Sequence, residues 1–230
     1  MLGFDADDTL WQNARFFRLT QERFAELMGE FVEKPHLDAR LLAAERRNIG
    51  RYGFGVKGFT LSMIETAIEV SEARVDATVI AELLQAGREM LAHPIELLPH
   101  VEDTIATLSQ DHKLVLITKG DLLDQERKLA QSGLGPYFQA VEVVSEKTAA
   151  TYTRLFNRHG RGATNGVMVG NSMKSDILPM LQAGGHAVHI PDGAQPWALD
   201  HAEPPESHPR LTTLGSMANL VESIRIITRP

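Results

Sequence analysis

From about residue 101 to the end of the chain, short apolar runs alternate with helical segments. The apolar runs lie at 114–117, 140–144, 166–169 and 186–190, and the helical patterns lie at 101–108, 122–131, 149–159, 175–183 and 216–226. Short runs rich in branched side chains are typical of strands that are buried on both faces. Their alternation with helices is the pattern of βαβ units. Together with the apolar residues 2–4, this predicts an α/β fold with a three-layer, Rossmann-like parallel sheet.

The block between the first apolar run and residue 96 has a different pattern. Apolar residues recur there at helical spacing, and no strand-like run occurs. We therefore predict two domains, an α/β core domain of residues 1–12 and 96–230 and an inserted all-helical domain of residues 13–95. Residues 192–209 hold four of the eleven prolines and are expected to form a surface loop.

The composition excludes several classes of function. Lys and Arg number 23 and Asp and Glu number 30, a balance of 23 − 30 = −7. An acidic chain without a dense basic stretch is a poor binder of nucleic acid or anionic membranes, so neither is expected as a partner. Cysteine is absent, which excludes disulfides and thiolate chemistry. No apolar run is long enough to span a bilayer and no signal peptide is recognisable, so a cytoplasmic location is expected.

An acidic loop follows the first apolar run, with Asp5 and Asp7 two residues apart. Parallel sheets bind their ligands at the carboxyl ends of strands. Two carboxylates in such a place can divide the work of a nucleophile or metal ligand and of a proton carrier. The alternative is that Asp-Ala-Asp-Asp-Thr is only a turn that caps the next helix.

The other predicted strands also end in polar residues. Thr118 and Lys119 end the second, Lys147 follows the third, and Asn171 follows the fourth, with Asp176 five residues later. These strand ends offer carboxylate, hydroxyl, ammonium and amide groups at one edge of the sheet. Oxygen donors of this kind suit a hard divalent cation such as Mg²⁺.

These motifs resemble those of the haloacid dehalogenase superfamily of hydrolases. The family's first motif, Asp-x-Asp-x-Thr after a strand, matches Asp5 to Thr9, and its second, a strand ending in Thr or Ser, matches residues 114–118. Lys147 matches the third motif, and residues 170–176 match the fourth in part. The resemblance covers the whole chain, because the helical insert is similar to the helical cap of that family.

The resemblance implies a role for each matching residue. Asp5 would be the nucleophile that takes up a phosphoryl group, and Asp7 the general acid and base. Thr118 and Lys147 would hold the phosphoryl oxygens, with Lys119 as a further substrate-binding residue.

The family's metal is Mg²⁺, which the Asp5 carboxylate, the Asp7 backbone carbonyl and Asp176 would bind. The chain departs from the family at Asn171, where an Asp is common. The side-chain carbonyl of Asn171 can bind a metal, but it adds no negative charge.

A glycine-rich stretch interrupts the helical block at residues 50–58. In one interpretation it is only a loop between two helices. In the other it is a cap loop that contacts the substrate, and then Arg51 and Lys57 would be substrate-binding residues.

The resulting prediction is a Mg²⁺-dependent phosphatase that hydrolyses a small phosphorylated metabolite through an aspartyl-phosphate, as a monomer or homodimer. A 2-haloacid dehalogenase is the first alternative, although that branch lacks the second Asp of the first motif, as phosphonate hydrolases normally do. A phosphomutase of the same family would share the motifs. A non-catalytic binding protein with a degraded metal site is a further alternative, because of Asn171.

Overall fold

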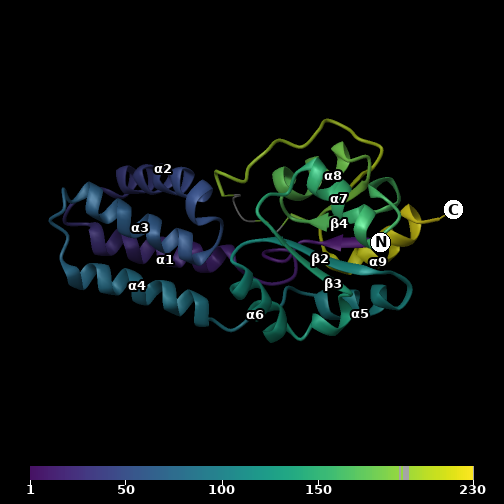
Figure 1. Ribbon diagram of the computed structural model, residues 1–230, viewed down its shortest axis with the longest axis horizontal. Helices are drawn as coiled ribbons and strands as arrows, with labels where there is room; N and C mark the ends of the chain where they lie inside the picture. Colours follow the sequence, from purple (N-terminus) through teal and green to yellow (C-terminus); the bar gives the residue numbers. More distant parts are fainter. Residues whose placement is uncertain (192, 194–196, 230) are drawn as a thin grey trace. The chain divides into compact units, whose positions relative to one another are not determined.

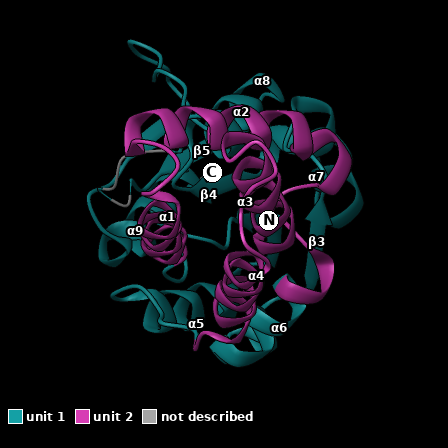
Figure 2. Cartoon of the chain, turned by 90° about the vertical axis from the view of Figure 1, so that its left-hand side faces the viewer, with its two compact units in different colours: residues 1–12, 95–119, 125–230 teal, residues 13–94, 120–124 magenta. Residues whose placement is uncertain are grey.

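The computed structural model of the chain describes residues 1–191, 193 and 197–229 (Figure 1). Its backbone contacts divide it into two compact units (Figure 2). An α/β unit comprises residues 1–12, 95–119 and 125–230, and a helical unit comprises residues 13–94 and 120–124. Part of the proline-rich segment predicted as a loop, residues 192 and 194–196, lies outside the described residues.

The α/β unit contains a six-stranded sheet in the order β3-β2-β1-β4-β5-β6, in which all neighbouring strands are parallel. Its strands are β1 (Leu2–Phe4), β2 (Leu114–Lys119), β3 (Ala140–Val144), β4 (Val167–Gly170), β5 (His186–His189) and β6 (Leu211–Thr213). The prediction of a parallel α/β sheet is confirmed. The edge strand β6 was not expected, because it has only three residues, none of them fully buried, and so lacks the apolar run of an interior strand.

Helices cover both faces of this sheet and complete two hydrophobic cores. The helices of the unit are α5 (Val101–Asp111), α6 (Leu122–Ser132), α7 (Ala149–His159), α8 (Leu178–Gln182) and α9 (Leu220–Ile227), although the first three residues of α6 group with the helical unit. Apolar residues of α5, α6 and α9 pack on one face, and those of α7 and α8 pack on the other. The segment predicted as one helix over 175–183 is a π-helical turn, Met173–Ile177, followed by α8.

The first strand is short but lies in the middle of the sheet. Phe4 pairs in register with Leu116 of β2 and Val169 of β4. Leu2 and Phe4 belong to one core, whereas a Cβ atom at Gly3 would meet side chains of the other core at 3.0–3.1 Å. Glycine is therefore needed at position 3 for the close packing of this face. The next residue after β1 is Asp5, which thus begins at the carboxyl end of a central strand.

The segments that lead out of the α/β unit and back into it are paired with each other. The Leu98 N–H donates a hydrogen bond to the Leu10 carbonyl, and the Gln12 N–H donates one to the Glu96 carbonyl, each over 2.9 Å. Trp11 forms an antiparallel bridge with Leu97 between them. Residues 10–12 and 96–98 therefore form a two-stranded neck at the base of the insert.

The helical unit consists of α1 (Ala14–Met28), α2 (Lys34–Tyr52), α3 (Val56–Val70) and α4 (Ala77–Ala92) in its described residues. They enclose a core of apolar side chains from every helix, among them Phe24, Leu41, Phe59 and Leu83. The break expected over residues 50–58 is shorter than predicted, because α2 continues through Gly50 and only residues 53–55 are non-helical. Gly53 and Gly55 have φ of 75° and 110°, which glycine adopts without steric cost.

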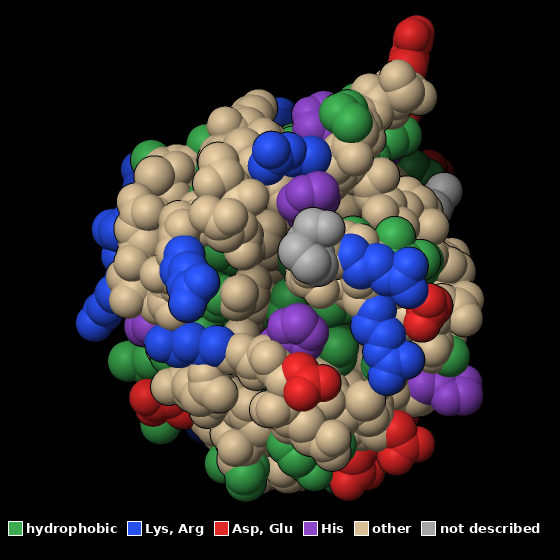
Figure 3. All heavy atoms as spheres, turned by 90° about the vertical axis from the view of Figure 1, so that its right-hand side faces the viewer, with side chains coloured by type: hydrophobic (Ala, Val, Ile, Leu, Met, Phe, Trp, Pro, Cys, Tyr) green, Lys and Arg blue, Asp and Glu red, His purple; other side chains and the backbone are tan. Residues whose placement is uncertain are grey.

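None of the described helices combines the length and the apolar composition of a membrane-spanning segment. Figure 3 shows one face of the molecule, on which basic and acidic side chains both occur.

Candidate active site

A buried ion-pair cluster lies at the carboxyl ends of the central strands. Lys147, from the loop after β3, places its Nζ 2.5 Å from Asp5 Oδ1 and 2.7 Å from Asp176 Oδ1. The backbone of Asp5 is fixed by a hydrogen bond from its N–H to the Val169 carbonyl. The sheet therefore brings together three residues that are up to 171 positions apart in the chain, all of them at most 7% exposed. The sequence predicted each of the three as a site residue.

The charges of this cluster do not balance, because two carboxylates face one ammonium. Burial alone would lower the pKa of Lys147, but the Asp176 and Asp5 carboxylates outweigh it and raise that pKa above its usual value. Burial and the negative charge of Asp5 raise the pKa of Asp176 to about 7, against the opposite effect of Lys147. Lys147 thus stays charged, and the excess negative charge would be relieved by a further cation.

Thr9 and Asn171 extend the cluster toward β4. The Thr9 hydroxyl lies 3.0 Å from Asp5 Oδ2 and 3.2 Å from Asn171 Oδ1, and it can donate its one proton to either oxygen. The Asn171 N–H donates to the same hydroxyl over 3.1 Å. The side-chain carbonyl of Asn171 thus lies within the cluster, and its metal-ligating role stays a prediction.

Asp7 lies in a second cluster. Its Oδ1 accepts hydrogen bonds from Trp11 Nε1 at 2.7 Å and Lys128 Nζ at 2.9 Å, and its Oδ2 accepts one from Gln125 Nε2 at 2.9 Å. Burial would raise the pKa of Asp7, but the charge of Lys128 and these hydrogen bonds together lower it below its usual value. Asp7 is therefore held as a carboxylate.

Thr118 and Lys119 end β2 beside these clusters. Thr118 is buried, and its hydroxyl lies 3.0 Å from Gln125 Nε2. Lys119 Nζ lies 2.7 Å from Ser175 Oγ and 3.2 Å from Asp200 Oδ1. Burial would raise the pKa of Asp200, but Lys119 and the hydrogen bonds around it lower that pKa. Lys119 is thus committed to an ion pair with the segment after β5, and its predicted role in substrate binding stays a prediction.

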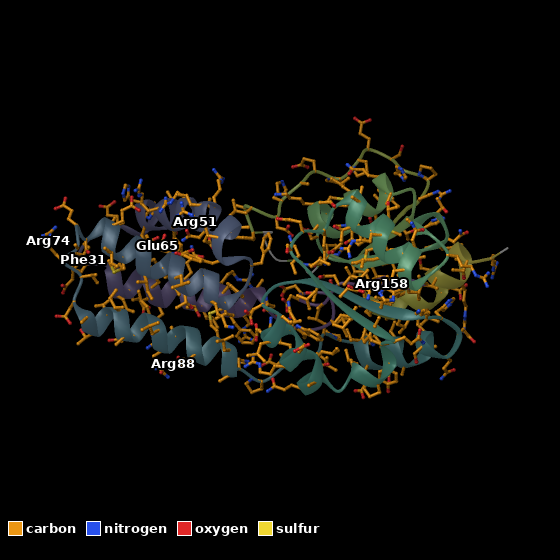
Figure 4. All side chains as sticks on the ribbon, in the orientation of Figure 1. Phe31, Arg51, Glu65, Arg74, Arg88 and Arg158 are labelled. Atoms are coloured by element: carbon orange, nitrogen blue, oxygen red, sulfur yellow. The ribbon has the colours of Figure 1, made fainter. Side chains whose placement is uncertain are left out.

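Arg51 and Lys57, the two predicted contacts from the insert, belong to the helical unit. Arg51 is exposed in the last turn of α2, and Figure 4 labels it and Glu65 of α3 on the helical unit. Lys57 Nζ lies 3.0 Å from both carboxylate oxygens of Asp121, a residue that groups with the helical unit. Their contact with a substrate stays a prediction.

Five residues of these clusters were not predicted as site residues and are not among those that the family motifs specify, namely Trp11, Gln125, Lys128, Ser175 and Asp200. Gln125 and Lys128 are three positions apart, which puts them on one face of α6. They are 2% and 8% exposed, and a buried Lys is rare unless it is paired. The signal was weak because nothing in the sequence of α6 says which face is buried. Asp200 lies within the proline-rich segment 192–209, and no pattern connects it to β2.

The donor set fits a magnesium ion that keeps some of its water ligands. Among the described residues, no group of three or more His, Asp or Glu side chains is placed to hold a metal. Position 171 carries an amide, and the Asp7 side chain is bound elsewhere. The side-chain donors at hand are the Asp5 and Asp176 carboxylates and the Asn171 carbonyl. Mg²⁺ is commonly bound by one or two carboxylates and retains waters, and its charge would balance the excess noted above.

The α/β unit thus has a Rossmann-like parallel sheet with paired aspartates after the central strand β1, a lysine in the loop after β3 and a buried aspartate after β4. The family model of haloacid dehalogenase-like hydrolases matches residues 2–184. The chain belongs to this family.

Solved structures agree with this assignment. A haloacid dehalogenase-like hydrolase from Xanthomonas campestris is 38% identical, with 99% of this chain and 91% of that chain covered and a TM-score of 0.87. A HAD-type hydrolase from Bacillus subtilis, bound to magnesium, is 18% identical over 100% and 98% of the two chains, with a TM-score of 0.66. A 2-haloacid dehalogenase from Pseudomonas syringae is 18% identical over 98% of each chain, with a TM-score of 0.62. A search of curated protein sequences gave no significant match.

Proposed function

We propose that the protein is a Mg²⁺-dependent phosphatase that hydrolyses a small phosphomonoester through an aspartyl-phosphate on Asp5. The observation that carries this proposal is the second carboxylate, Asp7, held by three hydrogen-bond donors two residues after Asp5. Displacement of halide from carbon needs only a nucleophile. Transfer of a phosphoryl group from an alcohol also needs a group that gives the leaving oxygen a proton and later activates water.

The proposed reaction has two steps. A carboxylate oxygen of Asp5 attacks the phosphorus atom and the bond from phosphorus to the leaving oxygen breaks. Asp7 gives that oxygen a proton, which it has taken up from the monoanion of the bound phosphate ester. A water molecule then attacks the phosphorus atom of the aspartyl-phosphate and passes a proton to Asp7. Asp7 returns this proton to the departing phosphate, which restores both carboxylates, so that one ester and one water become one alcohol and one phosphate.

Lys147 and Thr118 would hold the phosphoryl oxygens during both steps. The buried ammonium of Lys147 already touches Asp5, so it lies where negative charge accumulates when a phosphate approaches. Bound Mg²⁺, held by the Asp5 and Asp176 carboxylates, the Asn171 side-chain carbonyl and the Asp7 backbone carbonyl, would offset the repulsion between the nucleophile and the phosphate.

The proposal is tested by phosphate release from p-nitrophenyl phosphate, with Mg²⁺ and with EDTA. We expect release that requires the metal and is abolished in Asp5→Asn. Asp111→Asn, which changes an exposed carboxylate at the end of α5, is the matched control and should keep full activity.

Two other results would contradict this proposal and indicate a different function. Release of chloride from 2-chloropropionate without metal, in the absence of phosphatase activity, would indicate a dehalogenase. A folded protein that releases neither phosphate nor halide would favour a non-catalytic protein, and Asn171→Asp would then show whether the missing charge is the cause.

A further inference from the structure

Helix α6 presents two buried polar side chains to Asp7. Lys128 Nζ lies 2.9 Å from Asp7 Oδ1, and Gln125 Nε2 lies 2.9 Å from Asp7 Oδ2. Both residues come from more than 115 positions further along the chain, and both are almost completely buried. The Asp7 carboxylate is therefore held at each of its oxygens by a helix that belongs to none of the four sequence motifs.

The orientation of the Gln125 amide follows from its surroundings. Its Nε2 faces two acceptors that cannot donate, the Asp7 carboxylate and the Lys119 carbonyl, the latter at 2.7 Å. Its Oε1 is buried and has no hydrogen-bond partner among the described residues. A buried acceptor without a partner is costly, so the amide is oriented toward Asp7 at the expense of its other end.

The position of Lys128 also carries a cost. An ammonium group is expensive to bury unless a carboxylate pairs with it. The Lys128 side chain is only 9% exposed, and its ion pair reaches Asp7 rather than the surface. Trp11 Nε1 supplies the third donor, from only four residues away.

We propose that Lys128 and Gln125 are positioning residues that hold the Asp7 carboxylate where it exchanges protons with the leaving group and with water. This inference rests on the proposed phosphatase function and adds two residues of α6 to it. A group that transfers a proton must lie within hydrogen-bond reach of the reacting oxygen, and a small displacement is costly in rate. The attack by Asp5 does not involve the contact between Lys128 and Asp7. Gln125 also lies 3.0 Å from the Thr118 hydroxyl, so the test is made at Lys128.

The inference therefore makes a prediction about leaving groups. The p-nitrophenolate ion is weakly basic and departs without a proton from Asp7. The benzyl alkoxide is strongly basic and needs that proton. Loss of the Lys128 charge removes one cause of the lowered pKa of Asp7, but it also frees the carboxyl group to move away from the leaving oxygen. If Lys128 acts by holding Asp7 in place, its loss should slow the first step for benzyl phosphate far more than for p-nitrophenyl phosphate, a substrate of similar size.

The experiment measures kcat/KM for p-nitrophenyl, phenyl and benzyl phosphate in Mg²⁺, with wild type and Lys128→Met. We expect kcat/KM for benzyl phosphate to fall about tenfold or more, within the range that proton transfer contributes, and that for p-nitrophenyl phosphate to fall much less. The value for phenyl phosphate should lie between them. Lys128→Arg keeps a charged donor and should recover part of the loss. Glu126→Gln, on the exposed face of α6, is the control.

A double-mutant cycle separates positioning from a purely structural role. Adding Lys128→Met to Asp7→Asn should cost little further on benzyl phosphate, because the group that Lys128 positions is already lost. Equal losses on all three substrates, or no loss on benzyl phosphate, would overturn the inference while leaving the phosphatase intact. Wild type that hydrolyses none of the esters would refute the proposed function, and with it this inference. If Lys128→Met does not fold, Lys128→Gln is measured on the same series.

Discussion

The backbone of Gly170, at the end of β4, lies directly against the carboxylate of Asp176, and a Cβ atom at position 170 would overlap with Asp176 Oδ2 and Cγ. Asp176 is completely buried and is held by Lys147 and by the Ser172 N–H, so it has no room to move aside. The absence of a side chain at Gly170 therefore determines where this acidic group lies.

Gly170→Ala should displace Asp176 from Lys147. We expect a loss of about 1–3 kcal/mol in the free energy of unfolding, typical of an overfilled core, and weaker Mg²⁺ binding. Urea unfolding and calorimetric titration with Mg²⁺ measure the two effects. Gly50→Ala is the control, because a Cβ atom there meets nothing within 4 Å and lies in a helix, so this variant should be as stable as wild type or more stable. Unchanged stability and metal binding in Gly170→Ala would contradict the prediction.

Lys147→Met should leave two buried carboxylates without their common partner. Removal of one partner from a buried ion pair costs about 3–5 kcal/mol, and we expect a loss of that size near neutral pH. The loss should shrink as the pH falls, because protonation of Asp176, whose pKa is already raised, ends the repulsion. Mg²⁺ should raise the melting temperature of the variant more than that of wild type. Thermal melts with and without Mg²⁺ measure both trends, and a pH-independent loss would be contrary to the expectation.

The hydrogen bonds and the ion pair of Asp7 lead to a prediction about the stability of the protein at low pH. The folded state lowers the pKa of Asp7 below 3.8, so the unfolded chain binds a proton more readily than the folded protein does. The stabilisation by this carboxylate is therefore complete above 3.8 and is lost as the pH falls through the lowered folded value. The stability difference between wild type and Asp7→Asn should be constant near neutral pH and should decrease below about pH 4. Urea unfolding at several pH values measures this difference in the free energy of unfolding. A difference that increases as the pH falls would contradict the prediction.

Asn171→Asp should lower the stability of the metal-free protein and raise its affinity for Mg²⁺. The variant adds a third carboxylate near Asp5 and Asp176, so the metal-free protein should unfold more easily. It should bind Mg²⁺ about tenfold more tightly, since the affinity of such sites increases with ligand charge. Calorimetric titration and melting in EDTA test the two parts. Asn165→Asp, at an exposed position before β4, is the control and should leave the affinity for Mg²⁺ unchanged.

The sequence allowed the sheet and the Lys147 cluster to be predicted because both depend on local patterns. Buried parallel strands appear as apolar runs, and the rule that their carboxyl ends form one edge brings Asp5, Lys147 and Asp176 together. The short strand β6 could not be predicted in this way, because an edge strand has no continuous apolar run.

The partners of Asp7 and Lys119 could not be predicted for a different reason. These partners are Gln125, Lys128 and Asp200. They reach Asp7 and Lys119 only because one face of α6 and a segment distant in the sequence pack against the ends of strands, and the sequence does not show this packing. The glycine-rich stretch was placed too broadly, because composition alone does not distinguish a glycine inside a helix from one with a positive φ.

The two-stranded neck formed by residues 10–12 and 96–98 bears on how proteins of this kind can evolve. The outgoing and returning segments pair with each other within the α/β unit, and neither the strand pairs of the sheet nor the ion pairs of Lys147 involve a residue of the insert. A shorter or longer cassette joined at these six positions would leave the strand register and the Lys147 cluster intact. Recombination can thus exchange the variable part of the chain while the reacting groups are inherited unchanged, and grafting the insert of a relative at the neck is a practical route to chimeras.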